Sequence, residues 1–381
     1  MPGERRVVIV GGGIGGLTAA IALRGVGIES TVYEQAPELR EVGAGIGLWA
    51  NALHVFRRLG LAPAVLRLGA GPLGGGIRSR RGRWLTRQPA SVLERRWGEP
   101  TIAVLRADLQ ALLLAALPAD VVRLDARAIE IRQATDGMVV RFENAETATG
   151  DVVVGADGLH SVVRAQLFDA QPPRYRGYTA WRGVARPGAV AGVDRSSEFW
   201  GRGERFGVLP VRDGRVAWYA SANAPAGSVD TAGAMAALLQ RFGGWRAPIP
   251  AVLAATPDDT IVKNDVYDRP LTRRLVVGRA ALLGDAAHPM APDLAQGGCQ
   301  AIVDAWALAD SLGGSDDIAH ALRDYQRRRW RTAAVATLFA RTLGQVGQWK
   351  HPVACWARAG ALSATPLWLQ LRTLDAVMRD G

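Results

Sequence analysis

The sequence of 381 residues contains two cysteines, Cys299 and Cys355, and lacks any apolar run of the ~20 residues that a membrane-spanning helix needs. Two cysteines cannot build a disulfide framework, so we expect a reducing, cytoplasmic setting. Because the sequence has neither a Cys-x-x-Cys pair nor a His/Cys/carboxylate cluster with metal-ligand spacing, we expect no metal site. The hydrophobic fraction of 49% and the charged fraction of 21% are ordinary for a globular chain long enough for two domains.

The net charge of +11 comes largely from arginine, with a dense group at Arg323, Arg327, Arg328, Arg329 and Arg331. Aromatic residues lie among these arginines, which is compatible with nucleic-acid binding. However, the group falls on one predicted helix and matches no known binding module, so we expect no nucleic-acid partner. A solvated helix face, or a basic surface that attracts an anionic nucleotide, is the favoured interpretation.

The most informative segment is residues 7–17, an apolar strand that breaks into glycines where a helix must begin. Its G-x-G-x-x-G frame falls on Gly11, Gly13 and Gly16. The first glycine permits a tight turn, the second lets the backbone approach a pyrophosphate, and the third lets the helix pack on the strand. The helix predicted at residues 17–24 would direct its N-terminal amides at the phosphates.

A second predicted strand, residues 30–33, ends in Glu34, near the usual ~20-residue interval for the carboxylate that binds a ribose hydroxyl. This order of elements predicts a dinucleotide-binding α/β unit. The alternative is a signal peptide, since Arg5 and Arg6 precede an apolar stretch. Five glycines would weaken a signal helix, no small-residue cleavage site follows, and cleavage would remove the nucleotide site, so we reject this alternative.

Two further apolar strands, predicted at residues 151–155 and 275–283, lead into carboxylates. Asp157 and Gly158 follow the first strand, and Gly284 and Asp285 follow the second. Ligands of open α/β sheets bind at the carboxyl ends of strands, so these residues are candidates for cofactor binding. Arg106 opens another predicted helix, where it is either an exposed residue of a core helix or a guanidinium directed at the cofactor.

These motifs resemble the single-component FAD-dependent aromatic hydroxylases, which are flavoprotein monooxygenases with the p-hydroxybenzoate hydroxylase fold. The resemblance rests on residues 11–16 with Glu34, on residues 156–158, on residues 284–299, and on residues 42–53, which are similar to the loop that flanks the flavin. It implies an α/β fold in which a Rossmann-like FAD-binding domain carries an inserted β-sheet substrate domain and C-terminal helices. The implied FAD-binding domain comprises residues 1–75, 101–175 and 269–335, the substrate domain residues 76–100 and 176–268, and the C-terminal helical segment residues 336–381.

The resemblance also implies tightly bound, non-covalent FAD, with NADPH or NADH as a transient reductant. Glu34 would bind the adenosine ribose, Arg106 the phosphates or ribityl chain, and Asp285 that chain, whereas Asp157 would serve both nucleotides. The implied cofactor-binding residues are Gly11, Gly13, Ile14, Gly15, Gly16, Glu34, Gln35, Gly45, Arg106, Ala128, Asp157, Gly158, Gly284, Asp285, Pro292, Gly297, Gly298 and Cys299.

The glycine-rich turn at residues 296–299 opens a helix predicted at residues 300–312, whose free amides would face the flavin. By resemblance, the catalytic residues are Pro292, Gly297 and Gly298, beside the place where a flavin C4a-hydroperoxide forms. We interpret His288 as structural, and we expect Cys299 to contribute its amide rather than its thiol. The sequence departs from the family at Ala50, Asp293 and Ala295, where proline, asparagine and glycine are common, so substrate preference or peroxide chemistry can differ.

Short β-rich runs between residues 177 and 224 predict the substrate sheet, with a hairpin turn at residues 212–214. Period-two alternation places Ala217, Tyr219 and Ser221 on one face, and the sequence does not say which face meets the substrate. By resemblance, the substrate residues are Arg205, Tyr219 and Leu48. Arg205 matches an arginine of urate-type members, but Ala217 stands where those members carry a catalytic tyrosine, so we do not expect urate itself.

The expected function is therefore NAD(P)H-consuming hydroxylation of a small phenol-, quinolone- or polyketide-like substrate with dioxygen, by a monomer or homodimer. Epoxidation of an alkene or terpenoid and a non-catalytic flavin-binding scaffold remain alternatives. No second G-x-G-x-x-G is present, so NAD(P)H has no dedicated domain. Near the C-terminus, after a long helix predicted at residues 318–343, we expect Trp349, Trp356 and Trp368 to be buried against the cofactor domain rather than to cap a substrate entrance.

Overall fold

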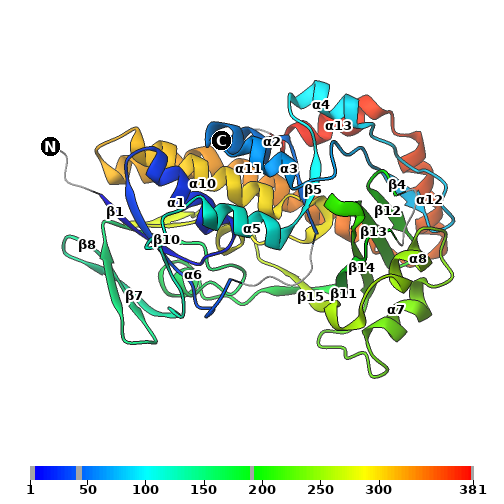
Figure 1. Ribbon diagram of the computed structural model, residues 1–381, viewed down its shortest axis with the longest axis horizontal. Coiled ribbons are helices and arrows are strands. Elements are labelled where there is room, and N and C mark those ends of the chain that lie inside the picture. The colour runs from blue at the N-terminus through cyan, green and yellow to red at the C-terminus, as the bar shows by residue number, and fades with distance from the viewer. Residues whose placement is uncertain (1–4, 40–44, 189–192, 379–381) are drawn as a thin grey trace.

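Two six-stranded sheets organise the chain in the computed structural model, which describes residues 5–39, 45–188 and 193–378. The sheets lie toward opposite ends of the long axis, with long helices between them (Figure 1). The first sheet has the strand order β16 (Val276–Val277), β17 (Ala280–Leu282), β10 (Val152–Gly155), β1 (Arg6–Val10), β2 (Glu29–Tyr33) and β6 (Val122–Arg123). The α/β class and the Rossmann-like sheet agree with the sequence prediction.

The strands from β17 to β6 pair in parallel, so their carboxyl ends meet at one edge of the sheet. The segments that carry Gly11, Glu34, Asp157 and Asp285 each follow one of these strands. Two helices begin near that edge and pack against each other, α1 (Ile14–Gly25) and α10 (Gly297–Gly313). The strand interiors are apolar and buried, which is typical of a parallel sheet covered on both faces.

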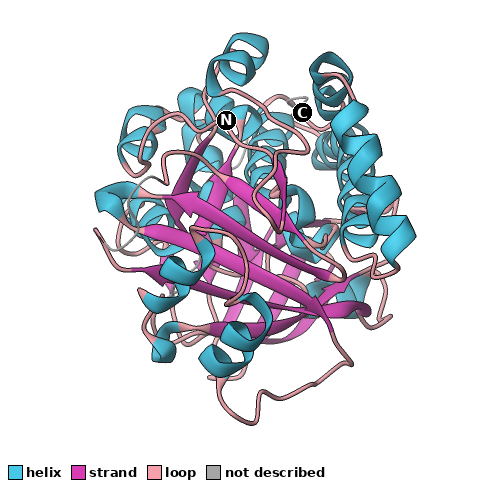
Figure 2. Ribbon diagram, turned by 90° about the vertical axis from the view of Figure 1, so that its right-hand side faces the viewer, coloured by secondary structure: helices cyan, strands magenta, loops and turns pink. Residues whose placement is uncertain are grey.

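The second sheet has the strand order β15 (Val262–Asp268), β11 (Arg174–Ala185), β14 (Val216–Asn223), β13 (Glu204–Pro210), β12 (Ser197–Trp200) and β4 (Ile77–Ser79). Its strands cross the middle of the molecule in Figure 2, with helices around them. On one face, Trp181, Phe206 and Trp218 pack beneath α7 (Ala234–Phe242) and α8 (Ile249–Ala254). Alternation leaves the other face of these strands for the site described below.

The remaining elements connect and cover the two sheets. The small strands are β3 (Gly45–Leu48), β5 (Ile102–Leu105), β7 (Ala128–Ala134), β8 (Gly137–Phe142) and β9 (Thr147–Gly150). The other helices are α2 (Ala50–Arg58), α3 (Ala62–Arg67), α4 (Ala90–Trp97), α5 (Arg106–Ala115), α6 (Val162–Leu167), α9 (Gly284–Ala287), α11 (Ile318–Gly347), α12 (Pro352–Ala364) and α13 (Leu367–Asp375). Short 3-10 helices lie at η1 (Arg212–Gly214), η2 (Asp258–Thr260) and η3 (Pro292–Leu294). Within the described residues, none of the helices is long and apolar enough to cross a membrane.

Two predictions of local structure were wrong. The strand predicted at residues 275–283 is an antiparallel pair, β16 and β17, because Gly278 turns the chain with φ of +55°. The tryptophans expected to be buried are exposed instead, by 42% at Trp349, 79% at Trp356 and 61% at Trp368. Helix α11 continues through residue 335, and the division into domains stays a prediction.

Candidate active site

The turn after β1 is shaped by three glycines with different steric tasks. Gly11 has φ of +109°, and a Cβ there would collide with the Ala156 carbonyl oxygen. A Cβ at Gly16 would collide with the Gly11 carbonyl oxygen, so Gly16 allows α1 to pack closely on the strand. A Cβ at Gly13 would meet no atom within 4 Å, so the backbone there faces open space.

Glu34 is fixed beside this turn by two backbone amides. Its Oε2 accepts a hydrogen bond from Gly12 N at 2.7 Å, and its Oε1 accepts one from Ala36 N at 2.9 Å. Each carboxylate oxygen has a further lone pair for a ligand hydroxyl. A hollow opens next to Glu34, lined by Gln35, Asp125, Arg127, Glu143 and Asn144.

Asp157 caps helix α6 in addition to lying at the sheet edge. It accepts hydrogen bonds from Ser161 Oγ at 2.6 Å and from Val162 N at 2.7 Å. Burial raises the pKa of the Asp157 carboxyl, and these hydrogen bonds oppose the rise. The adjacent Gly158 has φ of +74° and open space where a side chain would stand.

Asp285 and the start of α10 face each other at the same edge. A Cβ at Gly297 would lie 3.8 Å from Asp285 Oδ1, with no closer neighbour. The surrounding protein raises the pKa of the Asp285 carboxyl although its side chain touches solvent, and the nearby His288 and Arg106 oppose the rise. A Cβ at Gly15 would lie 3.2 Å from Ala301 Cβ, so α1 and α10 present their positive ends side by side.

Strand β3 lies across the first turn of α10 and is held there by Cys299. The thiol accepts a hydrogen bond from Trp49 N at 3.5 Å and donates one to Gly47 O at 3.4 Å. Burial raises the pKa of the Cys299 thiol to about 12, so it stays protonated at neutral pH. The thiol is thus occupied in packing, and the contribution of the Cys299 amide to the flavin stays a prediction. Residues 42–44 of the predicted flavin-flanking loop lie outside the described residues.

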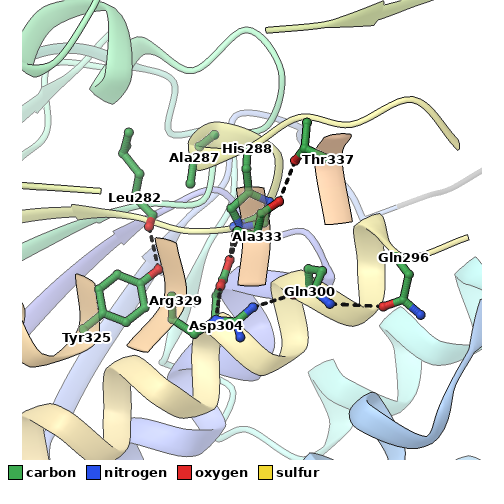
Figure 3. A network of polar contacts seen from close by, with 12 residues as sticks. Leu282, Ala287, His288, Gln296, Gln300, Asp304, Tyr325, Arg329, Ala333 and Thr337 are labelled. Atoms are coloured by element: carbon green, nitrogen blue, oxygen red, sulfur yellow. Dashed lines mark hydrogen bonds and ion pairs between the residues drawn. The ribbon is translucent and has the colours of Figure 1, made fainter. Parts of the chain in front are cut away.

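A buried polar network joins the Gly284 turn to helices α10 and α11 (Figure 3). Asp304 on α10 accepts a hydrogen bond from Gly284 N at 2.9 Å, and its second oxygen accepts one from Arg329 Nε at 2.6 Å. His288 Nε2 lies 2.6 Å from Asp304 Oδ2. Burial alone would raise the pKa of Asp304, but His288 and Arg329 hold it well below the ordinary value. This geometry agrees with a structural role for His288.

The network continues to the residue that precedes α10. Arg329 Nη2 donates to Gln300 Oε1 at 2.6 Å, and Gln300 Nε2 donates to Gln296 Oε1 at 3.1 Å. Asn51 Nδ2 on α2 donates to the same Gln296 oxygen at 3.0 Å. The turn at residues 296–299 is therefore braced by side chains from α2, α10 and α11.

The second sheet presents one face to this region. Register pairs Arg205 with Ser221 and Gly207 with Tyr219, so these residues share a face with Ala217. Ala217 Cβ lies 2.5 Å from the place of a Cβ at Gly45 on β3. The face of Ala217, Tyr219 and Ser221 therefore looks toward β3. The sequence had not determined which face of the sheet this would be.

Arg205 lies on this face in a buried cluster of charges. Its guanidinium forms ion pairs with Asp293 and with Glu198, the latter at 3.3 Å, and Tyr178 OH donates to Asp293 Oδ2 at 2.6 Å. Burial raises the pKa of Tyr219 well above its ordinary value, and the nearby Glu198 adds to the rise. Asp293, where asparagine is common in the family, thus has a cationic partner.

These observations fit a flavin adenine dinucleotide. The edge where strands of the first sheet end brings together four features that a dinucleotide needs. They are the open space at Gly13, the fixed carboxylate of Glu34, the exposed Asp285 and two helix N-termini. A model of the FAD binding domain family matches residues 4–340. The chain belongs to the FAD-dependent aromatic hydroxylase family.

Relatives with similar sequences include proteins named as monooxygenases and FAD-dependent hydroxylases. The chain is 45% identical over 352 residues to aurachin C monooxygenase/isomerase of Stigmatella aurantiaca, covering 92% of each chain. It is 36% identical over 329 residues to FAD-dependent urate hydroxylase of Klebsiella pneumoniae subsp. pneumoniae, covering 85% of each. The solved structure of Klebsiella pneumoniae HpxO with FAD and uric acid matches with a TM-score of 0.92 at 32% identity, covering 100% of this chain and 98% of that one.

The predicted site residues fall into two groups by their exposure to solvent. Arg106, Pro292 and Gln35 are exposed near the sheet edge or its turns, whereas Leu48 and Ala128 are buried in the core. The roles of all these residues stay predictions. Sequence analysis missed Tyr178, Glu198 and Arg182, which share the inward face of the second sheet by register. Burial lowers the pKa of Arg182, and the nearby Arg106 lowers it further. Strand alternation from Tyr219 was the signal that could have found them.

Proposed function

We propose that the chain binds FAD non-covalently, takes electrons from NADPH or NADH, and uses dioxygen to hydroxylate a small aromatic or heteroaromatic molecule. The observation that carries the proposal is the meeting of the Gly13 opening, Glu34, Asp285 and the α10 N-terminus at one sheet edge. Two of the named relatives are hydroxylases or monooxygenases, which favours hydroxylation over epoxidation. We propose the domain division given above and a monomer or homodimer.

The residues at this edge have separate tasks in binding. Glu34 would hold the ribose, Arg106 the phosphates, and Asp285 the ribityl chain. The amides of Gly297 and Gly298 would meet the flavin, where the α10 dipole stabilises negative charge. Bound flavin supplies electron transfer from the nicotinamide and the activation of dioxygen.

The substrate that we propose is uncharged and not urate. Arg205 is neutralised by Asp293 and Glu198, so it is not free to receive a substrate anion. Ala217 has no group for acid or base catalysis. Tyr219 is half-buried on the inward face and is the residue that we propose contacts the substrate, whereas Arg205 positions the η3 turn through Asp293.

The test is stimulated NAD(P)H consumption by the FAD-loaded chain with a panel of aromatic compounds. We expect neutral phenols and quinolones to accelerate consumption, and urate and benzoates to have little effect. A yellow protein that no compound stimulates would favour the flavin-binding scaffold. Asp285→Ala should lose FAD, whereas Asp157→Asn, which keeps an acceptor for Ser161 Oγ, should retain FAD but slow flavin reduction in stopped flow.

A further inference from the structure

Helix α12 buries its one charged side chain and exposes large apolar ones. Within this helix, every residue of which the structure describes, Arg358 is the one buried side chain. It is also the only charged residue in the helix sequence. The exposed face instead carries Val353, 65% exposed, and Trp356, 79% exposed. A surface helix normally does the opposite, so this outward face is suited to an apolar environment.

Arg358 fixes that orientation by serving as an anchor. Its Nη1 donates to Val346 O and to Gly347 O, both at 2.8 Å, and its Nη2 donates to Gly201 O at 2.7 Å. The guanidinium also lies 4.9 Å from the centre of the Trp200 ring. The anchor satisfies carbonyls at the end of α11 and holds α12 so that Val353 and Trp356 point outward.

The neighbouring elements also expose large apolar side chains. Trp349 precedes α12, and Trp368 and Leu369 lie on α13, with exposed fractions of 42%, 61% and 39%. Helices α12 and α13 follow each other along the outer side of the second sheet (Figure 1). We name the exposed side chains of Trp349, Val353, Trp356, Trp368 and Leu369 the tryptophan face.

Exposed cations lie on or beside the segments that carry the tryptophan face. From Trp349 to Leu374 the sequence contains Lys350, Arg358 and Arg372 and no aspartate or glutamate, and Arg358 is the buried anchor. Lys350, next to Trp349, and Arg372, on α13, are exposed, and Arg202 is exposed near Trp349, since Gly203 N donates to Trp349 O at 2.8 Å. The charge of the whole chain is +11.

We propose that the tryptophan face docks the protein on the surface of an anionic lipid bilayer, with α12 lying in the interfacial plane. Tryptophan is suited to this depth because its ring is apolar and its N–H is polar. The surrounding cations complement anionic headgroups, as in other interfacial helices. A second copy of this chain is disfavoured as the occupant, because a symmetric interface would bring the two basic rims together.

The test is sedimentation of the full-length, FAD-loaded chain with extruded vesicles. We expect binding to vesicles of phosphatidylcholine mixed with phosphatidylglycerol, weaker binding to phosphatidylcholine alone, and weaker binding at high salt. Val353→Asp and Trp356→Ser should each lower the partition coefficient by roughly tenfold or more. The matched control is Val229→Asp, since Val229 is 80% exposed in a loop before α7 and should bind as the original chain does.

FAD content and thermal unfolding should be unchanged in these variants, because their side chains are exposed. Trp368→Ser on α13 gives an independent check of the same face. Absence of binding to the anionic vesicles, or equal binding by the variants, would overturn the proposal. A dimer in sedimentation velocity that Val353→Asp dissociates would overturn it in favour of a second copy.

Discussion

A substitution at one residue of the cofactor edge can weaken FAD binding without unfolding the protein. Gly13→Val should weaken FAD binding, because the new side chain would fill the space that the backbone leaves open for the pyrophosphate. The fold should survive, since a Cβ there meets no atom within 4 Å. FAD titration and thermal unfolding of the apoprotein measure the two effects. Gly25→Val at the other end of α1 is the control, and equal FAD affinity in both variants would refute this role of Gly13.

Within the buried network, substitution of Asp304 is predicted to cause the largest loss of stability. Asp304→Asn leaves the fully buried Arg329 without its charged partner, which should lower the free energy of unfolding by roughly 3–5 kcal/mol at neutral pH. The exposed pair of Asp310 with Arg328 offers a control on the same helix, where Asp310→Asn should change stability by less than ~1 kcal/mol.

The same variant has a predicted pH dependence. The folded pKa of Asp304 lies below its unfolded value of ~3.9, so its contribution is present above that pH and is lost as the pH falls further. The stability difference between the original chain and Asp304→Asn should therefore narrow below about pH 4. Urea unfolding across this range measures it, and a difference independent of pH would contradict the assignment.

Residues whose constraint is local could be predicted from the sequence. Gly11 and Gly16 follow from the strand-to-helix turn that they must make, and Glu34 from the end of the next strand. The Asp304 network and the pairing of Arg205 with Asp293 could not be predicted, because each joins segments far apart in the chain whose approach depends on tertiary packing.

At the scale of elements, glycines in α11 allow the helix to approach the charged cluster. A Cβ at Gly344 would collide with the Asp293 carboxylate. Gly344→Ala should therefore destabilise the protein by ~1–3 kcal/mol although alanine favours helices. Gly360→Ala in α12, where a Cβ meets nothing within 4 Å, should instead stabilise by up to ~1 kcal/mol. In chemical unfolding, the two substitutions should change the free energy of unfolding with opposite signs. Stabilisation by both would refute the close approach of α11 to Asp293.

Element boundaries were predictable where pattern and packing agree. The strands of the second sheet and its 212–214 turn follow from alternation, and α1 follows from the glycine frame. The turn at Gly278 was missed because short apolar runs on both sides read as one strand. The exposure of Trp356 was missed because residue type predicts burial only on average. In α12 the buried position is occupied by Arg358, and Trp356 is on the exposed side.

At the scale of the whole molecule, the two six-stranded sheets meet at the turn that begins with Pro292. The first sheet supplies the strand ends for the cofactor, the second supplies the face of Ala217 and Tyr219, and α10 and α11 join them (Figure 1). Arg205 and Asp293 connect the second sheet directly to the turn that begins with Pro292. This arrangement would bring the cofactor and the proposed substrate together between the two sheets.

The central claim is that the chain inserts one atom of dioxygen into its substrate. The most direct measurement is mass spectrometry of the product formed by FAD-loaded protein, NADPH and a stimulating aromatic compound under ¹⁸O-labelled dioxygen. The account predicts that the product gains one labelled oxygen and that none enters from labelled water. Oxygen arriving from water, or product formed without oxygen incorporation, would contradict the monooxygenase assignment.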